Sequence, residues 1–94
     1  MEFKHEPGRY YIEDTQDNLL AEIVYPKIDD GENVVIDRTY VDPSLRGQGV
    51  AGKLVSLVVK EAREEGFKIE PLCTFAAGEF QRRPEYADVL RPTK

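Results

Sequence analysis

The first 41 residues alternate between apolar and polar positions in short stretches, and turn-forming residues separate these stretches. Alternation with a period of two is typical of strands that bury one face. The segments that we expect to be extended are residues 2–6, 9–13, 19–28 and 33–41. Residues 29–32, Asp-Asp-Gly-Glu, predict a tight hairpin turn, and the β-branched residues 34–36 predict a strand inside a sheet. We therefore predict an antiparallel meander of about four strands.

The period of the pattern changes after residue 49. Apolar residues now recur at the spacing of one helix face, namely Val50, Leu54, Leu57, Val58 and Ala62. Gly66 is a natural cap for the end of this helix. Residues 67–72 then predict a strand that returns parallel to residues 33–41, because a strand–helix–strand unit crosses over in this way. Short helical segments are expected at about residues 75–83 and 84–90.

Together these elements predict a single α+β domain over residues 1–94, with a meander, one α/β-type crossover around a central helix, and one or two short C-terminal helices. Hydrophobic residues make up 40% of the chain and charged residues 33%, which is typical of a soluble domain of this size. There is no apolar run of about 18–20 residues and no secretion signal at the N-terminus. We expect a cytoplasmic protein without a membrane partner, either a monomer or a weak dimer.

Cysteine and histidine each occur once in the chain, at Cys73 and His5. An intrachain disulfide, a cysteine-rich zinc site and a histidine-based metal cluster are therefore excluded, and no bound metal is expected. The net charge of −5 disfavours nonspecific binding to nucleic acid. Residues 1–37 carry ten acids and three Lys or Arg, and residues 38–94 carry eight acids and ten Lys or Arg. The second half, with a net charge of +2, therefore suits an anionic ligand.

Residues 46–52, Arg-Gly-Gln-Gly-Val-Ala-Gly, stand between the predicted strand at 33–41 and the predicted helix. Glycines at the start of a helix leave backbone N–H groups unpaired and uncovered, at the end of the helix that carries partial positive charge. This arrangement predicts a site for a phosphate of a cofactor.

Two phosphate-binding motifs match this loop only in part. Gly47-x-Gly49-x-x-Gly52 with Glu70 has the dinucleotide-binding spacing, but residues 42–46 separate it from the strand, and only 24 residues follow Glu70. Gly47 and Gly52-Lys53 nearly match the loop of nucleotide hydrolases, but Leu54 stands where Ser or Thr would hold magnesium. The first match is weak, and we reject the second.

A third motif, Arg46-x-x-Gly49-x-Ala51, resembles the coenzyme A pyrophosphate loop of the GNAT acetyltransferase superfamily. With Leu72-Cys73, Phe75 and residues 82–88, the chain resembles a group of very small single-domain GNAT-like proteins over about residues 33–90. The resemblance implies acetyl transfer from acetyl-CoA to an amine, such as a protein lysine, a protein N-terminus or a small amine. It also implies a set of cofactor-binding residues: Tyr40, Val41, Arg46, Gly47, Gln48, Gly49, Val50, Ala51 and Gly52.

Cys73 is the candidate catalytic residue, because it is expected to follow the strand that runs parallel to the cofactor strand. It could act as a nucleophile through an acetyl-cysteine, line the acetyl pocket, or be a buried structural cysteine. Asp37, Glu70 and Tyr86 are candidate bases for direct attack by an amine, and no spacing favours one of them.

Three arginines have two interpretations each. Arg38 stands where the small relatives often carry His, and it could contact phosphates or form a surface ion pair. Arg82 and Arg83 could reach the adenosine phosphates or face solvent. The alternatives to an N-acetyltransferase are a coenzyme A-binding module with little or no turnover, and an interaction module that pairs through a sheet edge.

Overall fold

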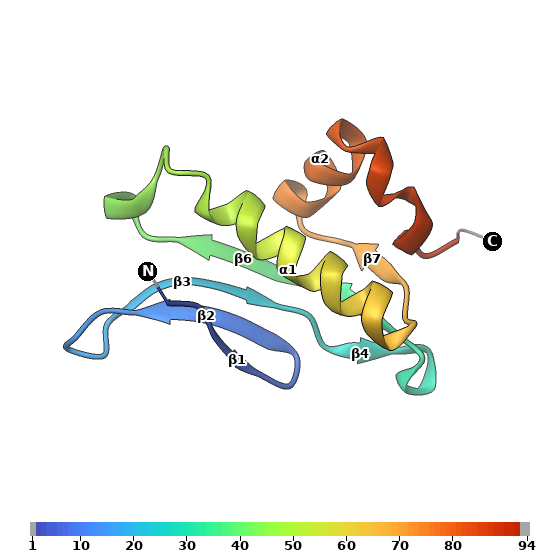
Figure 1. The fold of residues 1–94 in the computed structure, drawn as a ribbon, viewed down its shortest axis with the longest axis horizontal. Coiled ribbons are helices and arrows are strands. Elements are labelled where there is room, and N and C mark those ends of the chain that lie inside the picture. The colour runs from blue at the N-terminus through green and yellow to red at the C-terminus, as the bar shows by residue number, and fades with distance from the viewer. Residues whose placement is uncertain (1, 93–94) are drawn as a thin grey trace.

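The computed structural model describes residues 2–92, and these form two sheets on which the helices lie (Figure 1). The strands are β1 (Lys4–Glu6), β2 (Arg9–Glu13), β3 (Leu19–Val24), β4 (Lys27–Ile28), β5 (Asn33–Ile36), β6 (Arg38–Val41) and β7 (Ile69–Pro71). The helices are α1 (Val50–Glu65), α2 (Thr74–Arg82) and the 3₁₀ helices η1 (Asp29–Gly31), η2 (Pro43–Leu45) and η3 (Pro84–Val89). One sheet has the strand order β1-β2-β3-β6 and is antiparallel, and the other has the order β4-β5-β7.

The main elements agree with the sequence pattern. The meander and the turn at η1 are present, and β7 pairs parallel with β5 after the crossover through α1. Helix α1 ends at Gly66, whose φ of 85° lies in the left-handed region and whose N–H donates to the carbonyl of Ala62. The predicted α+β fold is confirmed.

The prediction of one continuous strand over residues 33–41 is wrong, because a β-bulge divides it into β5 and β6. Val24 pairs with Arg38 and Lys27 pairs with Val34, so residues 25–26 lie opposite residues 35–37, which is one residue more. The segment 19–28 is divided at the same place. Pro26 has no N–H to give to the ladder, although its carbonyl accepts from Val35 N–H at 3.0 Å.

The bulge determines which side chains face the core. Ile36 is fully buried and Thr39 lies opposite the buried Ile23, so both point toward α1. Asp37 and Arg38, between them, are exposed on the outer side. The bulge also places the two halves of the segment in different sheets. Strand β5 pairs with β7, whereas β6 pairs only with β3 within residues 2–92. One edge of β6 is therefore free.

The core lies between the sheets and α1, and α2 and η3 pack along one flank of α1 (Figure 1). The buried residues of α1 are Val50, Leu54, Val55, Val58, Val59 and Ala62. Leu57, which the pattern placed on the buried face, is only half-buried. Because α1 has packed neighbours on two sides, its buried surface is wider than a single apolar stripe, and Val55 and Val59 are part of it.

Candidate functional site

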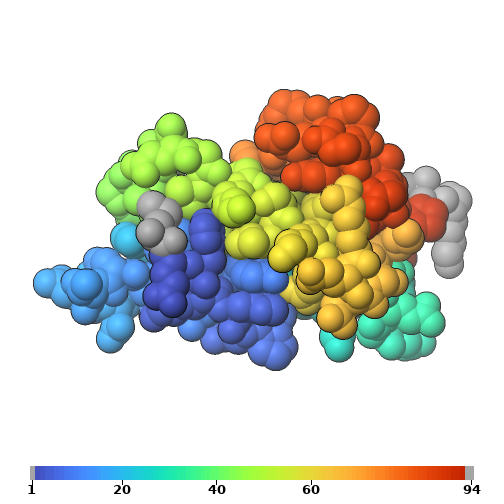
Figure 2. Space-filling view, viewed as in Figure 1, coloured from blue at the N-terminus to red at the C-terminus, as the bar shows by residue number. Residues whose placement is uncertain are grey.

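A pocket of about 540 Å³ lies between the start of α1, helix α2 and the end of β6. In the space-filling view it corresponds to the notch between the loop before α1 and α2 (Figure 2). Its lining consists of Val41, Leu45, Arg46, Gly47, Gly49, Val50, Ala51, Gly52, Lys53, Ser56, Phe75, Glu79, Arg83 and Tyr86. Seven of the nine predicted cofactor-binding residues are in this lining, and Tyr40 and Gln48 are not. The fold therefore brings most of the glycine loop to one cavity.

The glycine loop is held in place by the turn that precedes it. The carboxylate of Asp42 accepts hydrogen bonds from the hydroxyl and the N–H of Ser44, at 2.6 and 3.0 Å, which lowers the pKa of Asp42. Gly49 follows with φ 75°, a left-handed conformation that favours glycine. Helix α1 then begins without a side-chain cap.

The amides at the start of α1 are available to a ligand. The helix's first hydrogen bond runs from Lys53 N–H to the Gly49 carbonyl at 3.0 Å, so the N–H groups of residues 50–52 have no partner inside the helix. A Cβ atom at Gly47 or Gly49 would meet no atom within 4 Å, so the space over the loop is open. Unpaired amides at a helix N-terminus, under open space, fit an anion such as a phosphate.

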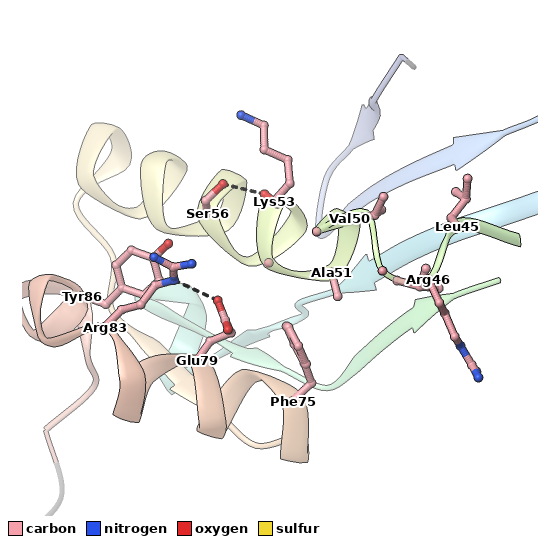
Figure 3. A pocket seen from close by; sticks show the side chains of 14 residues that line it. Leu45, Arg46, Val50, Ala51, Lys53, Ser56, Phe75, Glu79, Arg83 and Tyr86 are labelled. Carbon is pink, nitrogen blue, oxygen red and sulfur yellow. Dashed lines mark hydrogen bonds and ion pairs between the residues drawn. The ribbon is translucent and has the colours of Figure 1, made fainter. Parts of the chain in front are cut away.

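Helix α2 forms the opposite wall, and the side chains of Phe75 and Glu79 point from it toward α1 (Figure 3). Glu79 is only 4% exposed, and its Oε2 is 3.4 Å from the position that a Cβ on Gly52 would take. Its carboxylate accepts hydrogen bonds from Arg82 and, at 3.0 Å, from Nε of Arg83. Burial, the largest single effect, raises the pKa of Glu79. The hydrogen bonds and charges of the two arginines together lower it by more, so the net pKa is below its ordinary value.

The free edge of β6 forms the third side of the pocket. Asp42 N–H donates to the carbonyl of Leu20 in β3 at 2.7 Å. Backbone groups alternate between the two edges of a strand, so the peptide groups of Tyr40 also face β3, and those of Val41 face the free edge. The side chain of Tyr40 lies on the outer face, where the guanidinium of Arg38 is 5.3 Å from its ring. Of these two predicted residues, only Val41 lies at the pocket.

The model of the GCN5-related N-acetyltransferase (GNAT) family matches residues 9–89, which is most of the chain. The protein belongs to the GNAT family. A GCN5-like protein from Staphylococcus aureus, solved by NMR, is 39% identical, with 99% of this chain and 90% of that chain covered and a TM-score of 0.80. No curated protein matches the chain.

Larger acetyltransferase structures share the fold over part of their length. A GNAT-family protein from Staphylococcus aureus is 28% identical, with 67% of this chain and 52% of that chain covered and a TM-score of 0.57. A predicted acetyltransferase from Clostridium acetobutylicum, crystallised with acetyl-CoA, is 19% identical, with 92% and 58% covered and a TM-score of 0.56. The chain therefore spans little more than half the length of these two proteins, and the second similarity concerns the fold alone.

Cys73, the candidate catalytic residue of this GNAT domain, is half-buried just before α2. Its N–H donates to the carbonyl of Ile36 at 3.1 Å, and its Sγ is 3.4 Å from the hydroxyl oxygen of Thr39 in β6. The thiol therefore lies where β6 and β7 separate, two residues before Phe75 of the pocket wall. His5, the only histidine of the chain, is 3.0 Å from the Tyr25 hydroxyl and 3.3 Å from the Glu61 carboxylate, in another part of the fold.

The candidate bases are in three different environments. Asp37 is exposed at the bulge, and Glu70 accepts a hydrogen bond from Arg91 at 3.2 Å. Tyr86 is 7% exposed in the pocket wall, where burial, the largest effect, raises the pKa of its phenol. Among the described residues, no group of His, Cys, Asp and Glu side chains could hold a metal ion.

The three arginines with two interpretations differ in their position relative to the pocket. Arg38 donates to the carboxylate of Glu22 at 2.9 Å on the outer face of the sheet, in an ion pair, and it does not line the pocket. Arg83 lines the pocket and Arg82 does not.

Three polar residues of the pocket lining were not predicted to belong to the site, namely Glu79, Lys53 and Ser56. A signal for Glu79 is present in the sequence, because arginines three and four residues later are at ion-pair spacing on a helix.

No helix within residues 2–92 has the length and apolar character needed to cross a membrane.

Proposed function

We propose that this GNAT domain transfers the acetyl group of acetyl-CoA to an exposed amine. The observation that carries the proposal is that the unpaired amides at the start of α1 and the free edge of β6 meet at one pocket. When bound, acetyl-CoA would supply a thioester that is reactive toward nucleophiles.

The chain's residues divide the binding between two surfaces. The amides of residues 47–52 would hold the diphosphate, with Arg46 and Lys53 adding positive charge at the pocket. Val41 would pair its backbone with the amide-containing arm of the cofactor, as an added strand does, or donate its N–H to the thioester carbonyl. A donor of that kind is worth several kcal/mol at the transition state in other enzymes.

Cys73 is the candidate catalytic residue. As a nucleophile, its sulfur would bond to the acetyl carbon while the bond to the coenzyme A sulfur breaks, and the leaving coenzyme A thiolate would take up the cysteine proton. The amine would then attack the acetyl-cysteine, lose a proton and regenerate the thiol. If Cys73 only lines the acetyl site, the amine attacks the thioester directly, and no acetyl-cysteine forms.

The acceptor is best supplied as a protruding amine, such as a lysine side chain or a protein N-terminus. The described helices lie on one side of the antiparallel sheet, and its outer face is uncovered (Figure 1). An open surface of this kind suits a group presented by another molecule better than an enclosed metabolite.

A coenzyme A-binding module with little or no turnover is the second candidate. It is favoured by the surroundings of Cys73, since the polar side chain beside the thiol is the hydroxyl of Thr39 and the only histidine lies elsewhere.

An acetyl-transfer assay separates the two functions. The protein is incubated with acetyl-CoA and a panel of amines, coenzyme A release is quantified with a thiol reagent, and the intact protein mass is recorded. Release that depends on an amine supports transfer, and one added acetyl group that is absent from Cys73→Ala assigns the acetyl-cysteine. Binding of acetyl-CoA with no release for any amine would overturn the transferase and leave the binding module.

A further inference from the structure

Glu79 is an unexpected residue at a site for a polyanion. Three cationic residues line the pocket, Arg46, Lys53 and Arg83, and Glu79 is the single acid among the lining residues. Because it is 4% exposed and its net pKa is below the ordinary value, the carboxylate is buried and charged. An uncompensated buried negative charge would repel a phosphate, so the cations that pair with Glu79 decide its effect on the site.

Glu79 pairs with two cations, Arg82 and Arg83, and of these only Arg83 lines the pocket. Oε2 of Glu79 accepts from Nε of Arg83 at 3.0 Å, and the same oxygen is 3.4 Å from the position of a Cβ on Gly52. The carboxylate oxygen that accepts from Arg83 therefore lies close to Gly52, the last glycine of the loop. The nearest acid to Nη1 of Arg83 in the described ion pairs is Glu85, at 3.9 Å, beyond hydrogen-bond distance. Among the described residues, the terminal nitrogens of Arg83 make no hydrogen bond, and Figure 3 shows Arg83 at the pocket with its bond to Glu79.

We propose that Arg83, positioned by Glu79, binds a phosphate group of the cofactor. The inference rests on the proposed function, since it takes coenzyme A as the ligand of this pocket. A guanidinium matches a phosphate with two parallel N–H donors, and such charge-assisted pairs are stronger than neutral hydrogen bonds. Glu79 fixes Nε, so that less side-chain freedom is lost when the terminal nitrogens bind.

Arg82, the neighbouring residue and the last of α2, provides a matched control. It pairs with the same carboxylate, but it does not line the pocket. Its guanidinium instead lies over its own helix, with Nη1 3.2 Å from the position of a Cβ on Gly78. Arg82 and Arg83 thus share the charge and the partner, and differ in access to the ligand.

The test is calorimetric titration of coenzyme A into the wild type, Arg83→Gln and Arg82→Gln. Loss of one hydrogen bond between charged groups corresponds to about tenfold or more in affinity, which we expect for Arg83→Gln. Arg82→Gln should stay within about twofold of the wild type. The proposal is overturned if Arg83→Gln binds like the wild type or if both variants weaken binding equally. Failure of the wild type to bind would instead refute the proposed function.

Two further binding measurements identify the phosphate that is bound and test the role of Glu79. With dephospho-coenzyme A, an unchanged affinity for Arg83→Gln relative to the wild type assigns the contact to the 3′-phosphate, and an equal loss assigns it to the diphosphate. Glu79→Gln removes a negative charge, so simple electrostatics predicts tighter binding of the anion. The positioning role predicts weaker binding, with a melting temperature measured in parallel to confirm folding, and tighter binding would refute that role.

Discussion

Substitution of Gly49 by alanine separates the backbone's role in stability from its role in binding. Gly49 has φ 75°, and a Cβ there would meet no atom within 4 Å, so the change costs backbone strain but creates no clash. A left-handed conformation costs an L-residue about 1–2 kcal/mol, part of which the lower entropy of the unfolded chain offsets. We expect a loss of about 1 kcal/mol in the free energy of unfolding, or about 4–8 °C in melting temperature for a domain of this size.

Binding should change by more than stability does. The new methyl group would project into the open space over the loop, where we place the diphosphate. Displacing one amide–phosphate hydrogen bond costs about 1.5–3 kcal/mol, so the affinity for acetyl-CoA should fall about tenfold or more. Urea unfolding followed by circular dichroism gives the stability of the variant, and calorimetry gives its affinity.

Gly66→Ala is the matched control, because Gly66 caps the other end of α1 with φ 85° and equally open surroundings. It should lose a similar amount of stability and bind acetyl-CoA like the wild type. Equal affinities for Gly49→Ala and Gly66→Ala would refute the assignment of the loop.

Two predictions concern ionisable groups outside the pocket. The carboxylate of Glu22 accepts hydrogen bonds from Arg9 at 2.7 Å and from Arg38 at 2.9 Å. Burial, the largest single effect, raises the pKa of Glu22, but the two arginines together outweigh it, so the pKa in the folded protein is below its ordinary value. The charged carboxylate therefore stabilises the fold fully above about pH 4.3, the ordinary value, and this stabilisation is lost as the pH falls through the lower pKa of the folded state. Glu22→Gln should cost about 1–3 kcal/mol at pH 7 and flatten the acid limb of a urea-unfolding series, and an unchanged limb would contradict this. Burial, then the 2.6 Å bond to Glu61, raises the pKa of Tyr25, so stability should fall as the pH rises above about 10, the ordinary value for a phenol. Tyr25→Phe should cost about 1–2 kcal/mol and reduce this alkaline loss; an identical profile in unfolding experiments would count against the buried bond.

The elements that local chemistry defines were predictable from the sequence. The acidic turn at residues 29–32, the glycine after α1 and the proline that begins η3 each specify a backbone conformation by themselves. The helical spacing of the residues in α1 likewise needed no tertiary information. The glycine loop could be interpreted because its amides are left unpaired by the helix start itself.

The bulge at Asp37 was not predictable in the same way. It arises from how residues 35–37 pair with Tyr25 and Pro26, which a run of apolar residues does not reveal. The consequence is functional, since the bulge frees one edge of β6, the edge that the peptide groups of Val41 face. Glu79 was missed because its burial comes from the packing of α2 against α1, and a Glu on a short helix normally faces solvent.

The measurement that tests the central claim most directly is titration of acetyl-CoA into the isotopically labelled protein, followed by NMR of the backbone amides. We expect shifts concentrated at Val41 and at residues 47–52, with Gly66 and the outer face of the sheet unaffected. Binding without shifts at the glycine loop, or no binding at all, would contradict the assignment of this pocket to the cofactor.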